Sequence, residues 1–297
     1  MLRVIRAYSI MGKEFHTTAI ASQNELDDLH GKVEWLWVDC CDLEDKETTI
    51  ISKLLGVEAT TLDGIEDGKV RPSYEKCLDE ECPTHTWIST SVVEFTDELK
   101  LHPMSIILKD SFLITMRNGH SQRIIESAVR TFRTLRQEER TSSFMVSKLL
   151  YEIIDENSGV MVSIREWIDK IEGEVLEKPR DKSVTRSIFK LKRGLSALHR
   201  LLWAERELLS DMIVGVIPRM KLTKEAKVRV DDSMDDIDRE LEFVDSYNRS
   251  LDSVLRLQES ARSLGLIHGV ERTMVFVTVI LIIMTLGLII LEMTTPK

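Results

Sequence analysis

The spacing of apolar positions changes along this chain, and the change separates two regions of different fold. In the first 120 residues the apolar positions form short runs rich in β-branched and aromatic residues. Runs of this length and content predict strands at 2–10, 33–40, 85–95, 104–109 and 111–116. The Lys109-Asp110 junction predicts a tight hairpin between the last two strands.

A helix is predicted between the second and third of these strands, from Glu44 to Leu55, where apolar residues share one face and Gly56 follows. Strands and a helix of this kind bury their apolar faces most simply as a sheet with helices packed on it.

After about Ser121 the apolar positions repeat with the period of a helix. Pro179 and Pro218 are the only prolines between Pro103 and Pro296, and proline interrupts helices. We therefore expect three long helices, near 142–178, 181–216 and 220–291.

The last of these helices has an apolar stripe in its polar part, at three- and four-residue steps: Ile237, Leu241, Val244, Leu251, Val254 and Leu255. Two interpretations fit the pattern. The stripe packs against a second copy of the chain in a stalk, or it packs inside a three-helix bundle of one chain.

An uncharged apolar run of eighteen residues, Met274 to Leu291, lies close to the C-terminus. At about 1.5 Å of rise per residue it extends roughly 27 Å, close to the hydrocarbon thickness of a bilayer. It predicts a single membrane pass that anchors the chain at its C-terminal end. Three arginines precede the run, and Lys297 is the one basic residue after it in this sequence. Because basic residues favour the cytoplasmic side, this predicts that the bulk of the chain is cytoplasmic.

One face of this run has a regular order: Met274, Thr278, Leu281, Thr285 and Leu288 follow one another at four- and three-residue steps. In one interpretation this face lines a symmetric pore or a helix contact. In the other the helix is a plain anchor, and the two threonine hydroxyls bond to their own backbone.

Composition narrows the classes of function. The formal charge of −10 argues against nucleic acid as a partner and favours cations. The sequence has no GxGxxG, GxxxxGK or GxSxG motif, so nothing supports an enzyme. The four cysteines lie in the first third without a common zinc spacing, so we expect reduced structural thiols in a cytosolic setting, with a zinc site as the alternative.

The segment 231–245, DDSMDDIDRELEFVD, contains eight carboxylates and one arginine. Pairs four residues apart, such as Asp231 with Asp235, repel each other on a helix, and bound cations relieve that repulsion. Oxygen ligands of this type suit Mg²⁺ or Ca²⁺. A solvated acidic face without a specific site is the other interpretation.

Four stretches, in this order and spacing, resemble the CorA family of Mg²⁺ channels and transporters. They are WVDCCDLED at 37–45, RPSYE at 71–75, SIILKDSFLITMR at 105–117, and the helical segment 175–212 that contains Lys192-Arg193. The resemblance implies an α+β fold: an N-terminal α/β sandwich-like cytosolic domain, then long helices and a stalk helix that continues into a transmembrane helix, arranged as a funnel. It also implies a homopentamer that transports Mg²⁺, with Co²⁺ and Ni²⁺ as further candidates.

This sequence departs from the family pattern at the end of the membrane run. Glu292-Met293-Thr294 occupy the position of the family's Gly-Met-Asn motif, and the family's second membrane helix is missing from this sequence. We expect the Glu292 carboxylate to attract cations in place of the asparagine ring. Together with the face that begins at Met274, Glu292 completes the expected pore lining.

The family's regulatory Mg²⁺ sites suggest three metal ligands here. Asp232 and Asp235 match the acids of the stalk's Arg-Asp-x-x-Asp pattern. On the N-terminal domain the family's Leu-Glu-Asp-Ile becomes Leu-Asp-Gly-Ile at 62–65, which leaves Asp63 as the ligand. Because the match is incomplete, we expect weak or altered Mg²⁺ regulation.

These observations predict an α/β domain at 1–140, a long-helix and stalk region at 141–272, a transmembrane helix at 273–291 and a short tail at 292–297. The predicted function is divalent cation transport as a channel subunit in the cell membrane. The alternative is a membrane-anchored protein of the same fold that does not conduct and acts as an ion sensor or an oligomeric interaction protein.

Overall fold

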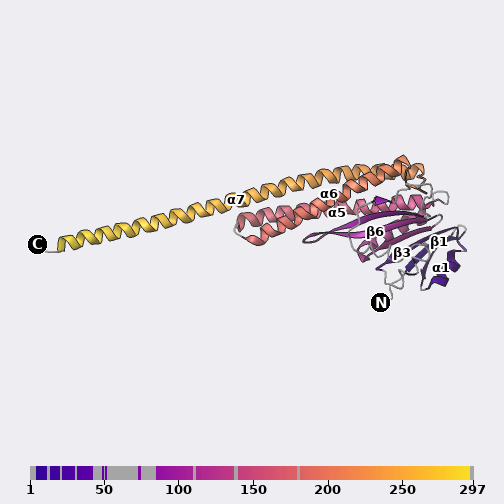
Figure 1. Cartoon of the computed structure of the whole chain (residues 1–297), viewed down its shortest axis with the longest axis horizontal. Coiled ribbons are helices and arrows are strands. Elements are labelled where there is room, and N and C mark those ends of the chain that lie inside the picture. Colours follow the sequence, from indigo (N-terminus) through magenta and orange to yellow (C-terminus); the bar gives the residue numbers. More distant parts are fainter. Residues whose placement is uncertain are drawn as a thin grey trace. The chain divides into compact units, whose positions relative to one another are not determined.

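A computed structural model describes most of the chain (Figure 1). The described residues are 5–11, 14–20, 22–30, 32–42, 49, 51, 73–74, 85–109, 112–136, 140–178 and 181–294. The chain divides into two compact units. Unit 1 comprises Met1–Arg165 and Lys190–Ser246, and unit 2 comprises Glu166–Phe189 and Tyr247–Lys297.

Unit 1 contains a mixed sheet with the strand order β2-β1-β3-β7-β6-β5-β4. Every described strand pair is antiparallel except β3 with β7, which is parallel. The strands are β1 (Ile5–Met11), β2 (Glu14–Ile20), β3 (Trp35–Cys41), β4 (Ser73–Tyr74), β5 (Thr86–Phe95), β6 (Leu99–Lys109) and β7 (Phe112–Arg117).

All five predicted strands are confirmed, as β1, β3, β5, β6 and β7, and the sequence missed β2 and β4. β2 pairs with β1 at the edge of the sheet, and its residues Thr17, Thr18 and Ala19 are exposed, so it lacks the apolar run of a central strand. The predicted β6–β7 hairpin is confirmed as an antiparallel pair, although its turn lies outside the described residues. Pro103 of β6 lies opposite Ser91 of β5 and one residue beyond the pairing with β7, so it interrupts no pair on the β7 side.

The three long helices are confirmed, and two shorter helices, α1 and α4, also lie within the described part of the chain. The helical elements are α1 (Gln23–His30), the 3₁₀ turn η1 (Gly119–Ser121), α4 (Gln122–Thr134), α5 (Ser142–Glu177), α6 (Lys182–Val214) and α7 (Lys224–Thr294). α5 ends two residues before Pro179, and Pro218 lies between α6 and α7, as the sequence predicted. The helix predicted from Glu44 to Leu55 falls almost entirely outside the described residues.

Local chemistry fixes the ends of these helices. Side-chain oxygens of Thr141, Asp181 and Thr223 accept hydrogen bonds from backbone N–H groups in the first turns of α5, α6 and α7. After α6, Gly215 adopts φ 81°, and its N–H bonds back to the Asp211 carbonyl at 3.0 Å. Glycine has no Cβ to oppose this left-handed conformation, so it ends the helix at low cost.

Helices cover both faces of the sheet, as alternation along β3 shows. Leu36, Val38 and Cys40 lie in an apolar cluster that also includes Leu26 of α1. On the opposite face the Trp35 ring stacks on Phe132 of α4, with 4.5 Å between ring centroids. Side chains alternate along the strand, so the adjacent thiols differ in burial: Cys40 is buried and Cys41 is half-buried.

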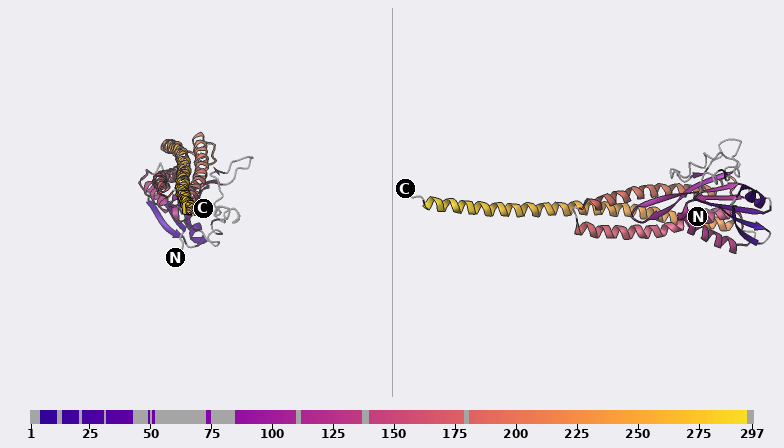
Figure 2. Two further views of the ribbon diagram at one scale, coloured as in Figure 1. Left: turned by 90° about the vertical axis from the view of Figure 1, so that its left-hand side faces the viewer. Right: turned by 90° about the horizontal axis from the view of Figure 1, so that it is seen from below.

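In unit 1 the parts of α5, α6 and α7 lie side by side along the sheet in Figure 1, and the views in Figure 2 agree. The stripe residues Ile237, Leu241 and Val244 of α7 are buried there within one chain. α6 approaches the sheet so closely that a Cβ added to Gly194 would lie 2.7 Å from the Leu99 Cβ at the start of β6.

Unit 2 packs its own helical segments together. Leu251 and Val254 of α7 are buried, and the Gln258 side chain accepts a hydrogen bond from the Thr185 hydroxyl of α6 at 2.9 Å. Of the two interpretations of the stripe, packing inside one chain therefore accounts for the burial of these residues.

Candidate functional site

The predicted pore face lies on α7, and its described members are exposed. Thr278 donates its hydroxyl hydrogen bond to the Met274 carbonyl at 2.7 Å, and Thr285 donates to the Leu281 carbonyl at 2.8 Å. Both bonds remain within the helix, so the described structure brings no second element to this face. The side chains of Leu288, Glu292, Met293 and Thr294 lie outside the described residues.

Within the residues that the structure describes, no helix contains a stretch long and apolar enough to span a membrane. The predicted pass at 273–291 is therefore not confirmed.

Apolar side chains are nevertheless exposed all around α7 between Thr273 and Leu286. The exposed fraction reaches 70% at Met274 and 66% at Phe276. A helix that is apolar on every side is unfavourable in water and is typical of a segment that another apolar phase or surface covers.

The predicted acidic ligands on α7 are not assembled with one another into a described metal site. Asp232 and Asp235 are exposed, and Asp63 lies outside the described residues. Other acids of the same segment have protein partners: Asp238 accepts a hydrogen bond from Arg206 of α6 at 2.6 Å, and Asp236 pairs with Arg239.

Two carboxyl groups are buried between the helices and the sheet of unit 1. Glu205 of α6 is 2% exposed and accepts a hydrogen bond from the Thr90 hydroxyl of β5. Glu240 of α7 is 3% exposed and accepts a hydrogen bond from the Asn157 amide of α5 at 3.2 Å. Desolvation raises the pKa of Glu205 to about 7 and that of Glu240 to about 8, because burial penalises the charged form.

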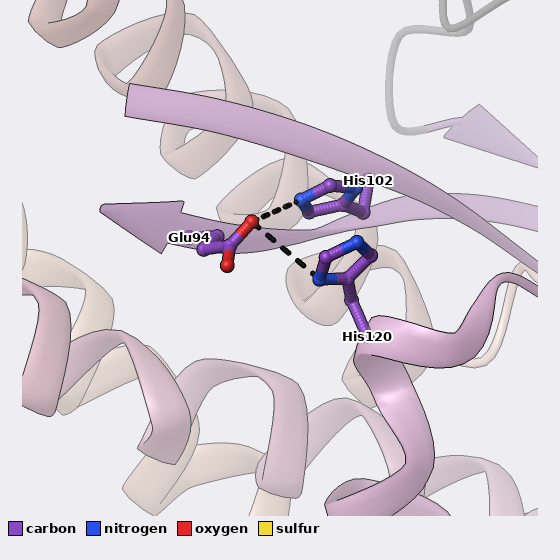
Figure 3. A group of neighbouring side chains, drawn as sticks. All are labelled: Glu94, His102 and His120. Carbon is purple, nitrogen blue, oxygen red and sulfur yellow. Dashed lines mark hydrogen bonds and ion pairs between the residues drawn. The ribbon is translucent and has the colours of Figure 1, made fainter. Parts of the chain in front are cut away.

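A group with the chemistry of a metal site lies at the other end of β5 (Figure 3). Glu94 of β5, His102 of β6 and His120 of η1 place one ligand atom each within 4.8 Å of one another. The Glu94 Oε2 lies 2.8 Å from the His102 Nε2 and 3.5 Å from the His120 Nδ1. Among the described residues this is the one group of three or more such side chains that could hold a metal ion.

Strand register and a capped turn position the three side chains. His102 pairs with Val92 across β5 and β6, which puts Glu94 on the adjacent diagonal of the same face. Asn118 ends β7 and accepts a hydrogen bond from the His120 N–H at 3.2 Å, which fixes the start of η1. The two imidazole rings stack with 3.8 Å between centroids.

Hydrogen bonding also sets the electrostatics of the group. The Asn118 amide lies 3.0 Å from the His102 Nδ1, so in the metal-free protein the His102 proton sits on Nε2 and is donated to Glu94. This hydrogen bond, opposed by desolvation and helped by the charge of His120, holds the pKa of Glu94 below its usual value. Glu94 is therefore a carboxylate at neutral pH.

The sequence did not reveal this group because its members belong to three separate elements. The predicted strand 104–109 began too late to include His102, so the diagonal between His102 and Glu94 was hidden. The true length of β6, from Leu99, would have placed the two side chains on one face. His120 joins them only through the fold, since its position depends on where β7 ends.

Comparison with known proteins extends over both units. The model of a family described as CorA-like Mg²⁺ transporter protein matches residues 32–291. The chain is also 28% identical over 123 residues to the cobalt/magnesium transport protein CorA of Thermotoga maritima. That match covers 41% of this chain and 34% of the relative, so it spans about a third of the curated protein's length.

Solved structures show the same fold. The complete structure of the CorA magnesium transporter from Methanocaldococcus jannaschii matches with a TM-score of 0.75 at 19% identity, over 100% of this chain and 89% of that one. The soluble domain of CorA from the same organism matches with a TM-score of 0.69 at 20% identity, over 88% of this chain and 98% of that one. The predicted order of an N-terminal α/β domain followed by long helices is confirmed.

Proposed function

Because the chain belongs to the family of CorA-like Mg²⁺ transporter proteins, we propose that it carries Mg²⁺ or a similar divalent cation across a membrane as one subunit of a homo-oligomer. The observation that carries this proposal is the extent of the family match. It runs from residue 32 to residue 291 and so includes the whole apolar run at the end of α7.

In this proposal Met274–Leu291 is the membrane-spanning segment and the remainder is cytoplasmic. The exposed apolar side chains between Met274 and Leu286 support it, because lipid would cover them on every side. A pentamer, as the family resemblance implies, would bring five copies of the Met274, Thr278, Leu281, Thr285 and Leu288 face together around an axis. Glu292, Met293 and Thr294 would then form the ring at one end of the pore.

The same proposal assigns Asp63, Asp232 and Asp235 to a Mg²⁺-sensing contact between subunits. Support comes from the exposure of Asp232 and Asp235 on α7, since exposed carboxylates are accessible to an ion or a second subunit. The incomplete match to the family pattern predicts a weak site. Millimolar Mg²⁺ should therefore raise the melting temperature only slightly, and Asp232→Ala should remove even that increase.

Transport is tested with the full chain reconstituted in liposomes that contain a Mg²⁺-sensitive dye. We expect Mg²⁺ influx that depends on the protein and on an inside-negative potential. Glu292→Gln should lower the influx severalfold, because it removes the negative ring that attracts cations. Glu259→Gln, an exposed α7 substitution ahead of the membrane segment, is the matched control and should leave influx unchanged.

Equal influx in Glu292→Gln and the parent protein would remove Glu292 from the pathway without removing transport. The absence of influx from a correctly inserted oligomer would overturn the transport proposal.

A second function has one observation in its favour. Glu292-Met293-Thr294 replaces the Gly-Met-Asn motif that the family resemblance leads us to expect. The chain would then be a non-conducting, membrane-anchored protein that senses ions or holds partners. A stable oligomer in detergent, combined with no uptake of Mg²⁺, Co²⁺ or Ni²⁺, would support this function instead.

A further inference from the structure

We propose that Glu94, His102 and His120 form a binding site for a transition-metal dication of the Zn²⁺, Co²⁺ or Ni²⁺ type, on the surface of unit 1 and separate from the transport pathway. The proposal rests on the geometry of the three side chains and not on the function proposed above. It concerns metal binding by the folded protein, which is measurable whether or not the protein conducts.

The donor set selects the class of metal. Two imidazole nitrogens and one carboxylate oxygen are ligands that suit Zn²⁺, Co²⁺ and Ni²⁺, whereas Mg²⁺ prefers oxygen ligands and keeps several waters. A single carboxylate does not compensate Mg²⁺ for the loss of its hydration shell. The site should therefore distinguish these ions from the cation that the family name specifies.

Two of the three distances between ligand atoms are close to those around a bound metal, and all three are within 4.8 Å. Zinc lies about 2.0–2.2 Å from nitrogen and oxygen ligands, so tetrahedral ligand atoms are roughly 3.3 Å apart. Glu94 and His120 already meet this spacing at 3.5 Å, and Glu94 and His102 would separate by about half an ångström from 2.8 Å. The two rings are stacked and nearly parallel, at 14°. Because an imidazole nitrogen binds a metal in the plane of its own ring, the half-exposed His120 ring must tilt for both nitrogens to meet one ion.

The surroundings leave the site open and partly preorganised. Glu94 and His120 have side chains 36% and 50% exposed, so an ion and a water in the fourth position have access. His102 is only 14% exposed and is held at Nδ1 by Asn118. When a metal takes the His102 Nε2, the ring proton moves to Nδ1, and the Asn118 amide must rotate to present its oxygen to that proton. That rotation gives up the hydrogen bond from the His120 N–H, so η1 adjusts as the metal binds.

A bound ion would also link three segments of unit 1. Glu94 and His102 lie close to the turn of the β5–β6 hairpin, and His120 lies in η1, directly before α4. Ligands from separate elements tie binding to folding, because the unfolded chain does not preform the site. Metal should therefore raise the melting temperature in proportion to the logarithm of its concentration.

The test uses the full chain in detergent with Zn²⁺ and Co²⁺ as probes. Competition with a chromophoric chelator should show one Zn²⁺ per chain, and Co²⁺ should give the visible absorption of a site with nitrogen and oxygen ligands. His120→Ala and Glu94→Gln should each weaken Zn²⁺ binding at least about tenfold. Removing a residue that only hydrogen-bonds to a metal ligand already lowers metal affinity by about that factor. His199→Ala removes a histidine of α6 outside the group and should leave binding unchanged.

Three results would overturn the proposal: no more Zn²⁺ bound by the parent than by the double variant Glu94→Gln/His120→Ala, Zn²⁺ binding in both single variants as tight as in the parent, or Mg²⁺ binding at this group as tightly as Zn²⁺. Should His102→Ala fail to fold, His120→Ala and Glu94→Gln still decide, because their side chains are substantially exposed. Mg²⁺ influx without added Zn²⁺ should be the same in His120→Ala as in the parent, which separates this site from the transport proposal.

Discussion

The centre of the sheet and the layer of helices beside it both bury carboxyl groups, but they satisfy them in different ways. Asp39 of β3 accepts two hydrogen bonds from the Arg117 guanidinium of β7, at 2.9 and 2.8 Å, and one from the Thr115 hydroxyl at 2.8 Å. Glu205 and Glu240 each have one hydrogen-bonded oxygen and one buried oxygen without a partner among the described residues.

The difference follows from what each region can place beside a carboxyl group. β3 and β7 are parallel neighbours in register, so Arg117 and Thr115 lie within reach of Asp39. Burial alone would lower the pKa of Arg117, but the hydrogen bond and charge of Asp39 outweigh it and the pKa is raised. In the part of the chain that the structure describes, Glu205 and Glu240 are hydrogen-bonded to Thr90 and Asn157 rather than to a cation, and their raised pKa values favour the neutral acid. Buried charge in this fold is therefore tolerated where a cation comes with it.

The largest effect should come from removing that cation. Arg117→Met leaves Asp39 buried and unpaired, which should cost about 3–5 kcal/mol of stability. At about 2–4 °C per kcal/mol, thermal unfolding followed by circular dichroism should show a melting temperature lower by roughly 10 °C. Arg123→Met, which removes one half of an exposed pair with Glu156, is the control and should change little. Equal effects of the two substitutions would show that Asp39 does not depend on its partner.

The second-largest effect should be a pH dependence of stability, which comes from the buried carboxyl groups that have no paired cation among the described residues. Because the folded-state pKa values of Glu205 and Glu240 lie above the usual 4.5, the folded protein holds protons that the unfolded chain has lost. Their stabilising contribution is complete below about pH 4.5 and is lost as the pH rises through about 7 and 8. Glutamine imitates the neutral acid, so the double substitution Glu205→Gln/Glu240→Gln should remove this loss, worth at least about 2 kcal/mol between pH 5 and pH 9.

The measurement is the difference in melting temperature between the double variant and the parent at each pH. Glu242→Gln, at an exposed position two residues further along α7, is the matched control and should give a constant difference. A constant difference for the buried pair as well would mean that both carboxyl groups are ionised in the folded protein at neutral pH.

A matched pair of threonine substitutions compares the two regions directly. Thr115→Val removes a hydrogen bond to the charged Asp39 and also the acceptor of the buried Trp37 indole N–H, so it should cost at least about 1.5–3 kcal/mol. Thr90→Val removes a hydrogen bond to Glu205, which is largely neutral below pH 7, and should cost about 1 kcal/mol at pH 6. Thermal unfolding at pH 6 and pH 9 should show the gap between the two variants narrowing at the higher pH. A gap that is the same at both pH values would contradict the neutral state of Glu205.

The smallest effect should appear on the surface of the same helices. Arg206 and Asp238 form an exposed pair in which the pKa of Arg206 is raised by the hydrogen bond and charge of Asp238. Solvent and salt screen this pair, so Arg206→Gln should cost less than about 1 kcal/mol, and less still in 0.5 M NaCl. A loss of stability larger than this and independent of salt would show that the Arg206 pair behaves like the buried Asp39–Arg117 pair of the sheet.

The architecture was largely predictable from the sequence because it depends on local periodicity. The apolar runs located β1, β3, β5, β6 and β7, and Pro179 and Pro218 marked the breaks between α5, α6 and α7. β2 escaped because an edge strand need not be apolar, and α1 because it is only eight residues long. The sequence left the packing of the α7 stripe open, since intramolecular and intermolecular bundles need the same repeat.

The candidate sites were less predictable because they depend on distance in the fold. The acidic segment 231–245 predicted an acidic face, but its sequence did not distinguish buried from exposed acids. Glu240 is buried beside Asn157, whereas Asp232 is exposed on the same helix. Glu94, His102 and His120 are separated by eight and eighteen residues and meet only through strand register and the end of β7. The order of CorA-like segments supplied the family, which the family match confirms.

The close approach of Gly194 to Leu99 has a mechanical consequence. Sliding α6 by one turn, about 5.4 Å, would bring a residue one turn away opposite the Leu99 Cβ, and every such residue carries the Cβ that Gly194 lacks. The contact therefore prevents this part of α6 from sliding along its own axis past β6. Any motion within unit 1 must therefore move β6 and this part of α6 together, with its flexibility at their ends.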